Sequence, residues 1–463
     1  MAKEEKPKTK SPLQWANEYF NYYGSIEVEN EHGLKVLHKK LVYWRGEFYE
    51  WVDGIYRLAA DLDEKIRGYV AGGGISPTPD YINNVKYNLR GSTYLVKARV
   101  LNTRLTDTKN LDEPIRAITT KNKIVVFGND GSVTTTPLTP DFFSVVKLPY
   151  GYDETAVCPL WDKFLAEVTM GDRDLVRLLQ QWAGYLLIPT HKYQCFLLCL
   201  GEGGMGKGTY FYVIMEMLGR ENCSAVPIRR FSDRFSLSHT YGKLLNIAGD
   251  AEEDLNPQTE GMIKEWTGED PMVFERKYEQ GFTADATAKL MISANTFPTF
   301  TDKSDGSWRR LKIASFNREN SSFVDSDLRQ KLKEELPGVL NWAIQGLKDL
   351  LSNNAFTLPE RSIELRDTFK GEANPAGVFL LDNYVFVSAS VGGVPVQQVY
   401  SRYAKWCRLK GYNPLSDKNF GREVIRLFPK VKRTRGEVKG VRVYLYQSLK
   451  LATDAEIRSP EFN

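Results

Sequence analysis

The segment 195–209 constrains this chain more than any other, and it reads CFLLCLGEGGMGKGT. An apolar run leads into a glycine-rich turn that ends in lysine, an order typical of a buried strand followed by a phosphate-binding loop and a helix. Closely spaced glycines allow successive backbone N–H groups to point into one concavity. Lys207 and the amino-terminal end of the following helix add positive charge, so the segment predicts a nucleoside triphosphate as ligand. A glycine-rich hairpin with an isolated lysine is the alternative. The residues expected to contact the triphosphate are Gly201, Glu202, Gly203, Gly204, Met205, Gly206, Lys207, Gly208 and Thr209.

The loop departs from the usual G-x-x-x-x-G-K-[ST] pattern at one position. Gly201, Gly206 and Lys207 satisfy the pattern, but Gly208 stands where a hydroxyl residue normally binds Mg²⁺, and Thr209 comes one residue later. One residue along a helix turns a side chain by about 100°, so Thr209 can replace the missing ligand only if the loop is shifted in register. The ending GKGT also occurs in loops like that of adenylate kinase. The loop alone therefore leaves both a phosphotransferase and a molecular motor open.

The next apolar segment after the loop ends in carboxylates. KLLNIAGDAEED (243–254) predicts a strand, and the end of a strand beside a phosphate loop is where a metal-binding acid and a water-activating acid are needed. We expect Asp250 to bind Mg²⁺, with Thr209 as the other candidate ligand, and Glu252 to act as the base. An acidic surface turn is the alternative.

Two further apolar segments carry polar residues that suit phosphate chemistry. AKLMISANTFPTF (288–300) predicts a strand that ends at Asn295, whose neutral amide can contact the γ-phosphate or hold the attacking water. GSWRRLKIASF (306–316) puts Arg309 and Arg310 just ahead of another strand. An arginine directed at phosphoryl oxygens can raise a rate by roughly 10³–10⁵. Taken alone, two such arginines are more often surface residues, which is the alternative.

Composition and residue spacing argue against a membrane-spanning protein, a secreted protein and a zinc-binding protein. The 463 residues leave room for about three domains, and 42% are hydrophobic while 26% are charged. The apolar runs are shorter than the roughly 18 residues that span a bilayer, and the charged start MAKEEKPKTKSP is a flexible tail without a signal-peptide pattern. Five scattered cysteines are expected to be small core residues in a reducing compartment, and four histidines form no cluster with them, so no zinc site is expected.

The net charge is only +4, but positive charge is concentrated near the carboxyl terminus. Between Arg402 and Arg442 there are thirteen Lys or Arg residues and three acidic ones, with Tyr403, Trp406, Tyr412 and Phe420 among them. Such a segment can follow nucleic-acid phosphates. Helices followed by the hairpin pattern KVKRTRGEVKGVRVYLY suit a winged-helix module, with KRTRGEVKG as the wing. A solvated basic face is the alternative. The DNA-binding candidates in the wing are Lys432, Arg433 and Arg435.

Periodicity predicts the remaining organisation. Residues 41–57 indicate a β-meander, 114–150 a β-rich stretch, and 159–187 and 335–353 helices. Asp61 and Asp63 superficially resemble a nucleotidyl-transfer pair, yet they stand at a predicted helix start, where acids are favoured, which disfavours a polymerase or primase. The expected parts are a tail (1–15), an α+β domain (16–158), a helical collar (159–192), an ATPase domain (193–355) and a winged helix (370–450).

The motif series identifies a resemblance. GEGGMGKGT, KLLNIAGD, IKEWTGEDPMVFERKY, AKLMISANTFP and GSWRRLKIASF, in this order, resemble a superfamily 3 helicase, and more narrowly the phage and plasmid primase-helicase group that includes the poxvirus primase-helicase. The resemblance covers roughly residues 80–450 and implies an α/β fold with an AAA+ P-loop core. It implies a ring, expected to be a hexamer, with ATP and Mg²⁺ between subunits. Lys207 and Asp250 would serve the subunit's own nucleotide, with Asn295 as sensor and Arg310, or else Arg309, as the finger from the neighbour.

The same resemblance implies contacts to DNA. Lys264, Gly268 and Asp270 fall on the family's extra motif, and the hairpin after it is expected to enter the central channel. There Arg276 and Lys277 would grip single-stranded DNA and Tyr278 would stack on bases; an exposed hairpin without such a role is the alternative.

These features predict an ATP-dependent replicative DNA helicase of a phage or mobile element, moving 3′→5′ on one strand and opening duplex DNA in the bacterial host's cytoplasm, without a membrane partner. Relatives often carry a primase domain, and neither a zinc ribbon nor a catalytic aspartate cluster is found in this sequence, so a separate primase or polymerase is a possible partner. An ATP-switched origin-binding initiator without processive unwinding is the second hypothesis, and a nucleotide kinase is the third.

Overall fold

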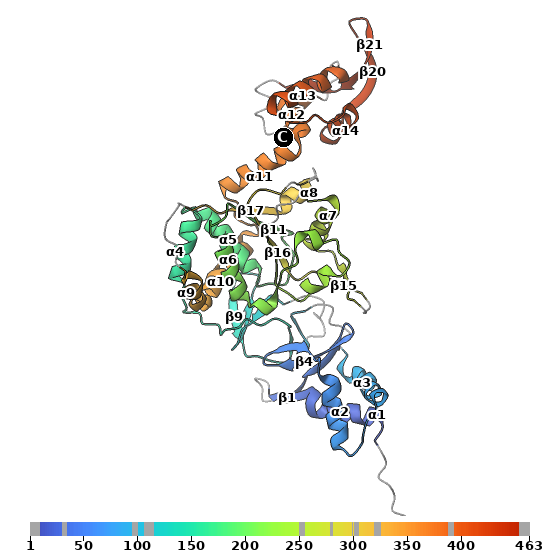
Figure 1. Ribbon diagram of the computed structural model, residues 1–463, viewed down its shortest axis with the longest axis vertical. Coiled ribbons are helices and arrows are strands. Elements are labelled where there is room, and N and C mark those ends of the chain that lie inside the picture. The colour runs from blue at the N-terminus through green and yellow to red at the C-terminus, as the bar shows by residue number, and fades with distance from the viewer. Residues whose placement is uncertain are drawn as a thin grey trace, which may run out of the picture. The chain divides into compact units, whose positions relative to one another are not determined.

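The computed structural model describes residues 10–29, 35–94, 101–105, 115–249, 255–277, 281–298, 300, 305–318, 326–387 and 393–452. The chain divides into two compact units, of which the first comprises residues 1–298 and 309–362 and the second residues 299–308 and 363–463 (Figure 1). Within the described part of the chain, no helix combines the length and the apolar character that crossing a membrane requires.

The β-meander predicted for residues 41–57 is confirmed. It consists of β3 (Leu41–Trp44), β4 (Glu47–Val52) and β5 (Ile55–Leu58), paired antiparallel in chain order. Each two-residue turn, Arg45-Gly46 and Asp53-Gly54, has positive φ at both positions, the geometry that matches the twist of the flanking strands.

Helix α2 (Leu62–Gly72) begins between the two aspartates that superficially resembled a catalytic pair. Asp61 lies 3.2 Å from the Lys65 ammonium, and Asp63 lies 2.6 Å from that of Lys86. Both acids therefore have local partners at a helix start, as the helix interpretation predicts. The other elements of this part are α1 (Pro12–Tyr19), β1 (Ser25–Glu29), β2 (Lys35–Lys39), α3 (Pro79–Thr93), β6 (Thr103–Arg104), β7 (Ala117–Thr119), β8 (Ile124–Phe127), β9 (Val133–Thr136) and β10 (Phe142–Phe143).

A five-stranded parallel sheet forms the centre of the first unit, which confirms a mixed α/β fold. Its spatial order is β12 (Cys223–Ser224), β13 (Leu245–Ala248), β16 (Lys289–Ala294), β11 (Phe196–Leu200) and β17 (Leu311–Ser315). The strands are apolar runs because both faces of a parallel sheet are covered. Since β16 lies directly beside β11, the residues after these two strands emerge together at one edge of the sheet.

Helices surround this sheet and share its main core. Figure 1 shows α4, α6, α9 and α10 gathered on one side of the strands and α7 on the other. Buried residues of α4, α5, α6, α9 and α10 pack in one cluster with those of β11. The helix predictions for 159–187 and 335–353 are confirmed. The helices and remaining strands are α4 (Pro159–Val168), α5 (Arg173–Tyr185), α6 (Lys207–Leu218), α7 (Pro257–Trp266), β14 (Met272–Phe274), β15 (Phe282–Ala284), α8 (Asp305–Arg310), α9 (Leu328–Glu334) and α10 (Leu336–Asn353).

Helices α5 and α10 approach each other closely because each has a glycine at the contact. A Cβ on Gly346 would lie 2.1 Å from the carbonyl oxygen of Gln180, and a Cβ on Gly184 would lie 2.3 Å from the backbone nitrogen of Leu347. Neither atom belongs to a flexible side chain, so any larger residue would force the helices apart.

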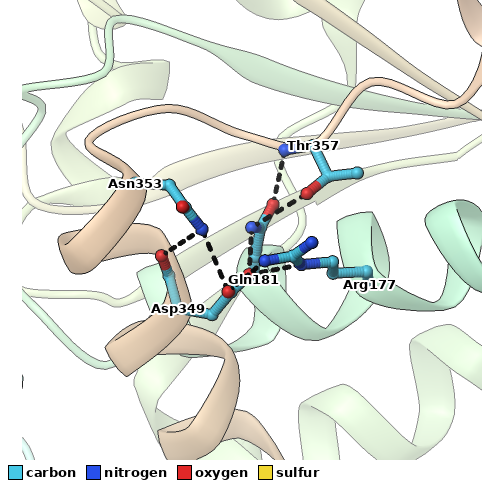
Figure 2. Close-up of polar contacts among 5 residues, drawn as sticks. All are labelled: Arg177, Gln181, Asp349, Asn353 and Thr357. Atoms are coloured by element: carbon cyan, nitrogen blue, oxygen red, sulfur yellow. Dashed lines mark hydrogen bonds and ion pairs between the residues drawn. The ribbon is translucent and has the colours of Figure 1, made fainter.

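A polar cluster joins the same two helices beside this contact (Figure 2). Asp349 of α10 accepts hydrogen bonds from Arg177 Nε (2.7 Å) and Asn353 Nδ2 (3.0 Å), while the buried Gln181 donates to Asp349 and accepts from the backbone N–H of Thr357 (2.7 Å). The hydrogen bond from Arg177 is the main reason that the pKa of Asp349 is lowered. Together with the hydrogen bond from Gln180 Nε2 to the carbonyl oxygen of Trp342 (3.0 Å), the cluster fixes the register of the two helices.

The second unit has its own core, built from helices and a long hairpin. Helix α11 (Glu360–Ala373) leads into it. Phe379, Tyr403, Phe420 and Tyr446 are almost wholly buried in one cluster. Its helices and strands are α12 (Pro375–Asn383), β18 (Tyr384–Phe386), β19 (Val394–Pro395), α13 (Val396–Lys410), α14 (Asp417–Leu427), β20 (Lys432–Val438), β21 (Val441–Gln447) and β22 (Leu449–Leu451). The β20–β21 hairpin extends beyond these helices in Figure 1 and confirms the hairpin predicted for this basic segment.

Candidate functional site

The glycine-rich loop connects β11 to α6, as the sequence predicts. Gly201 and Gly206 have φ values of 154° and 94°, in the region that favours glycine. A Cβ on Gly201 would lie 2.4 Å from the carbonyl oxygen of Phe316, and a Cβ on Gly206 would lie 2.5 Å from a methyl carbon of Val168. Both glycines are therefore required by the backbone path and by the close approach of neighbouring elements.

Lys207 and Asn295 meet at this loop. The Lys207 side chain is only 7% exposed, and its Nζ atom donates to the carbonyl oxygens of Gly201 and Glu202 and to Oδ1 of Asn295 (3.1 Å). Asn295 reaches this point because it follows β16, whose last residue Ala294 pairs with Leu200 of β11. An ammonium at a helix amino terminus can exchange one of these neutral acceptors for a phosphate oxygen, with which it forms a charge-assisted hydrogen bond. These residues fit a triphosphate.

Of the two residues expected to bind Mg²⁺, Thr209 and Asp250, the structure describes only Thr209. Gly208 offers no side chain, and Thr209 lies in the first turn of α6, where its N–H donates to the carbonyl of Gly206 (3.0 Å). Asp250 and Glu252 lie outside the described residues. Among the residues that are described, no three His, Cys, Asp or Glu side chains gather as a metal site.

Arg309 and Arg310 lie at the opposite edge of the sheet from Lys207. They end α8 immediately before β17, which runs parallel to β11 with Leu311 paired to Phe196. The loop that holds Lys207 follows the carboxyl end of β11. Five strand residues, roughly 16 Å, therefore separate the two edges. The structure does not bring the arginines to the nucleotide loop of their own chain.

Gln194, which the sequence analysis missed, holds the two arginines. Its Oε1 atom accepts from Arg309 Nη2 (3.3 Å) and Arg310 Nη2 (3.4 Å), and its Nε2 atom donates to Glu269 (3.3 Å). Gln194 has a φ of 43°, which is uncommon outside glycine. Burial is the first cause of a lowered pKa at Arg310, followed by the charge of Arg309. Nothing in the local sequence around position 194 signals this contact, because it depends on strand pairing.

The hairpin β14–β15 contains the residues expected to grip single-stranded DNA. The Arg276 guanidinium lies over the Phe282 ring at 5.1 Å, and Lys277 is exposed, while Tyr278 lies outside the described residues. The tip of the β-meander contacts the same hairpin, since Arg45 donates to the carbonyl of Thr283 (2.8 Å). Lys264 lies on α7, and Gly268 and Asp270 lie between α7 and the hairpin.

The wing candidates line one strand of the β20–β21 hairpin. Lys432, Arg433 and Arg435 are exposed on β20, and the guanidinium groups of Arg433 and Arg435 lie 4.7 and 5.4 Å from the ring of Tyr444 on β21. Arg435 Nε also donates to the Tyr444 hydroxyl (3.1 Å). These contacts with Tyr444 hold both guanidinium groups on the exposed face of the hairpin, where they can contact phosphates.

The aromatic residues that the sequence analysis associated with nucleic-acid binding serve the core instead. Tyr403 and Phe420 are fully buried and stack on each other at 4.4 Å, and Trp406 and Tyr412 stack at 5.6 Å while packing against the same cluster. Tyr403 and Phe420 thus belong to the core, and Trp406 and Tyr412 cover it. By contrast, Tyr444 is 43% exposed and lies among the wing cations.

Two family models match parts of the chain. Residues 199–310 match a family of unknown function (DUF5906), and residues 374–453 match the RFX DNA-binding domain. The first range includes the glycine-rich loop, Asn295 and both arginines, and the second includes the whole basic hairpin.

Sequence and structure comparisons agree with the fold. An inferred helicase of Acanthamoeba polyphaga mimivirus is 27% identical over 177 residues, which cover 36% of this chain and 18% of that protein. Three apo structures of the NrS-1 C-terminal region are similar, with TM-scores of 0.52, 0.50 and 0.54, identities of 11%, 10% and 12%, and coverage of 94–95% of this chain and 99–100% of those chains. This chain therefore has the mixed α/β fold of the NrS-1 C-terminal region and a distant sequence relationship to this mimivirus protein, of which it spans less than a fifth.

Proposed function

We propose that this chain is an ATP-dependent DNA helicase that acts as a ring, with six subunits expected, in the replication of a phage or mobile element. One observation carries the proposal: Lys207 and Asn295 meet at the carboxyl edge of the parallel sheet, while Arg309 and Arg310 lie at its amino edge. A single chain then has half of a phosphate site at each edge. Two chains placed edge to edge would complete one site.

In this proposal each residue has a distinct role. The loop amides and Lys207 bind the phosphates, and Asn295 orients the γ-phosphate or the attacking water. Arg310 of the neighbouring subunit, with Arg309 as the second candidate, stabilises charge on the phosphoryl oxygens. Mg²⁺, when bound, would polarise those oxygens, with Asp250 and Thr209 as the expected ligands and Glu252 as the expected base.

Two surfaces are proposed to contact DNA. Arg276 and Lys277 on the β14–β15 hairpin are candidates for single-stranded DNA in the channel, together with Tyr278. The wing residues on β20 are candidates for duplex DNA, supported by the RFX DNA-binding domain match over residues 374–453. Movement in the 3′→5′ direction and a separate primase or polymerase partner are expectations from the helicase resemblance alone.

The test is DNA-stimulated ATP hydrolysis and duplex unwinding by the wild-type chain and by Lys207→Ala. We expect single-stranded DNA to accelerate ATP hydrolysis, and Lys207→Ala to lose both activities because the phosphate cation is gone. Lys163→Ala is the matched control, since Lys163 is an exposed lysine on α4. If single-stranded DNA did not change the rate of ATP hydrolysis and no forked or tailed duplex were unwound, the helicase proposal would be refuted.

An ATP-switched origin-binding initiator is the second candidate, favoured by the DNA-binding domain match in the second unit. Footprinting at fixed salt separates the two, because an initiator protects one sequence preferentially and a motor does not. A nucleotide kinase, suggested by the GKGT ending, would instead transfer phosphate to a nucleoside monophosphate.

A further inference from the structure

Arg329 lies where the nucleotide loop lacks its usual hydroxyl group. A Cβ on Gly208 would lie 3.4 Å from Nη2 of Arg329 and, among the described residues, within 4 Å of no other atom beyond its chain neighbours and the backbone of its own helix. A serine or threonine hydroxyl would extend farther still, so it would have to turn away from the guanidinium or displace it. Position 208 is the hydroxyl position of the loop pattern. The missing side chain and the arginine therefore occupy the same region.

The placement of Arg329 follows from the packing of α9 against α6. The Arg329 guanidinium lies 5.4 Å from the ring of Tyr212, one helical turn after Gly208. One turn farther along both helices, Lys333 pairs with Glu216 at 2.9 Å. The two contacts advance in the same direction, so α9 runs parallel to α6 and its first turn lies at the loop end of α6. Leu332, fully buried in the main core, anchors α9 in this position.

We propose that Arg329 is a phosphate-binding residue of the nucleotide site in its own chain, and that its guanidinium replaces the hydroxyl missing at Gly208. This inference rests on the proposed function, because it concerns the same triphosphate. Arginine is permanently charged and binds phosphate oxygens through two N–H groups. It supplies positive charge beside the β- and γ-phosphates without a metal ligand. Nucleotide binding is then less dependent on Mg²⁺ than in a loop with serine or threonine at this position.

The test measures binding of a fluorescent ATP analogue to the full chain, once with Mg²⁺ and once with EDTA. Arg329→Ala is expected to weaken binding about ten- to a hundredfold, the effect of losing a hydrogen bond to a charged group. When Mg²⁺ is replaced by EDTA, the dissociation constant of Arg329→Ala should rise by a factor at least about ten times larger than that of the wild type. Lys333→Ala is the matched control, because it removes a cation from the same helix one turn away while Glu216 keeps its ion pair with Arg220.

A double variant tests the replacement itself. Gly208→Ser combined with Arg329→Ala restores a hydroxyl and removes the guanidinium, so it should bind the ATP analogue better than Arg329→Ala in Mg²⁺ but not in EDTA. Equal binding by wild type and Arg329→Ala under both conditions would overturn the proposal, and so would a double variant no better than Arg329→Ala in Mg²⁺. The failures are distinguishable: if the wild type binds no ATP, or Lys207→Ala binds it equally well, the proposed function itself fails.

Discussion

The guanidinium of Arg310 and the side-chain amide of Gln194 meet at the amino edge of the parallel sheet, with Nη2 of the arginine 3.4 Å from Oε1 of the glutamine. Both residues precede paired strands, so strand pairing brings them together. The same register keeps Arg310 away from Lys207 of its own chain. In the proposed ring, an arginine held in this way would be oriented before a second subunit binds.

Subunit mixing tests the role of Arg310 across an interface. Neither Arg310→Ala nor Lys207→Ala is expected to hydrolyse ATP alone. A mixed ring contains interfaces where an intact Lys207 meets an intact Arg310, so mixing should restore a fraction of the DNA-stimulated rate. The rate is measured across mixing ratios. Mixed rings that stay inactive, with mixing verified by differently labelled subunits, would contradict a role in trans.

Gln194 is predicted to position the arginines. Gln194→Asn keeps an amide and tolerates positive φ, but its side chain is one methylene shorter and cannot reach Arg310. We expect the rate constant of ATP hydrolysis to fall several-fold while the Michaelis constant for ATP and the melting temperature stay unchanged. A parallel fall in melting temperature would indicate a structural role instead.

The crossing of α5 and α10 should tolerate no side chain at Gly346. Gly346→Ala places a methyl group 2.1 Å from a backbone carbonyl before relaxation, so we expect destabilisation of about 1–3 kcal/mol in urea unfolding. Gly261→Ala on α7 is the control, because its Cβ meets nothing within 4 Å and alanine favours a helix by up to about 1 kcal/mol. Equal stabilities of the two variants would show that the helices can separate at no cost.

Stability is predicted to rise with pH from 6 to 8. Burial lowers the pKa of Lys289, whose Nζ donates to the carbonyl of Ile188, to about 7, and burial followed by the charge of Lys289 lowers the pKa of His191. In this range the unfolded chain binds more protons at both sites than the folded chain, so the free energy of unfolding increases with pH, by at most about 1.4 kcal/mol per pH unit and group.

Lys289→Met isolates the lysine contribution. The variant should show a flatter pH dependence of its melting temperature and should equal or exceed the wild type at pH 6, where the buried ammonium is most costly. Burial raises the pKa of all five thiols, that of Cys195 to about 12, so the cysteines oppose the trend increasingly as the pH approaches about 8.5 and flatten the rise near pH 8. An unchanged slope in Lys289→Met would contradict the assignment.

The wing should control the salt dependence of duplex DNA binding. Replacing Lys432, Arg433 and Arg435 with alanine is expected to weaken binding and to reduce the slope of log K against log salt by up to about 2.7, since each phosphate contact contributes about 0.9. Glu437→Gln on the same strand is the control, because it alters charge without removing a cation. A slope that matches the wild type would exclude the wing from the interface.

Much of the fold could be predicted from the sequence. The meander, the helices of 159–187 and 335–353, the strand before the glycine loop and the basic hairpin all follow from hydrophobic period and turn residues. Lys207 and Asn295 could be predicted as site residues because Asn295 directly follows one apolar strand, Lys207 closes the glycine loop that follows another, and parallel strands end at one edge. Gln194 and Arg329 could not be predicted as site residues, because a single glutamine or arginine outside a motif carries no local pattern.

The sequence by itself determined that a glycine loop with lysine joins a buried strand to a helix. It also determined that two later apolar segments end in polar residues and that a third is preceded by two arginines. Backbone sterics and side-chain periodicity are local properties, so they can be read from neighbouring residues. Only the tertiary structure decided that Asn295 meets Lys207, that the arginine pair lies at the far edge on Gln194, and that Arg329 comes to Gly208. These contacts join residues 88 to 121 positions apart, and strand order and helix packing bring them together.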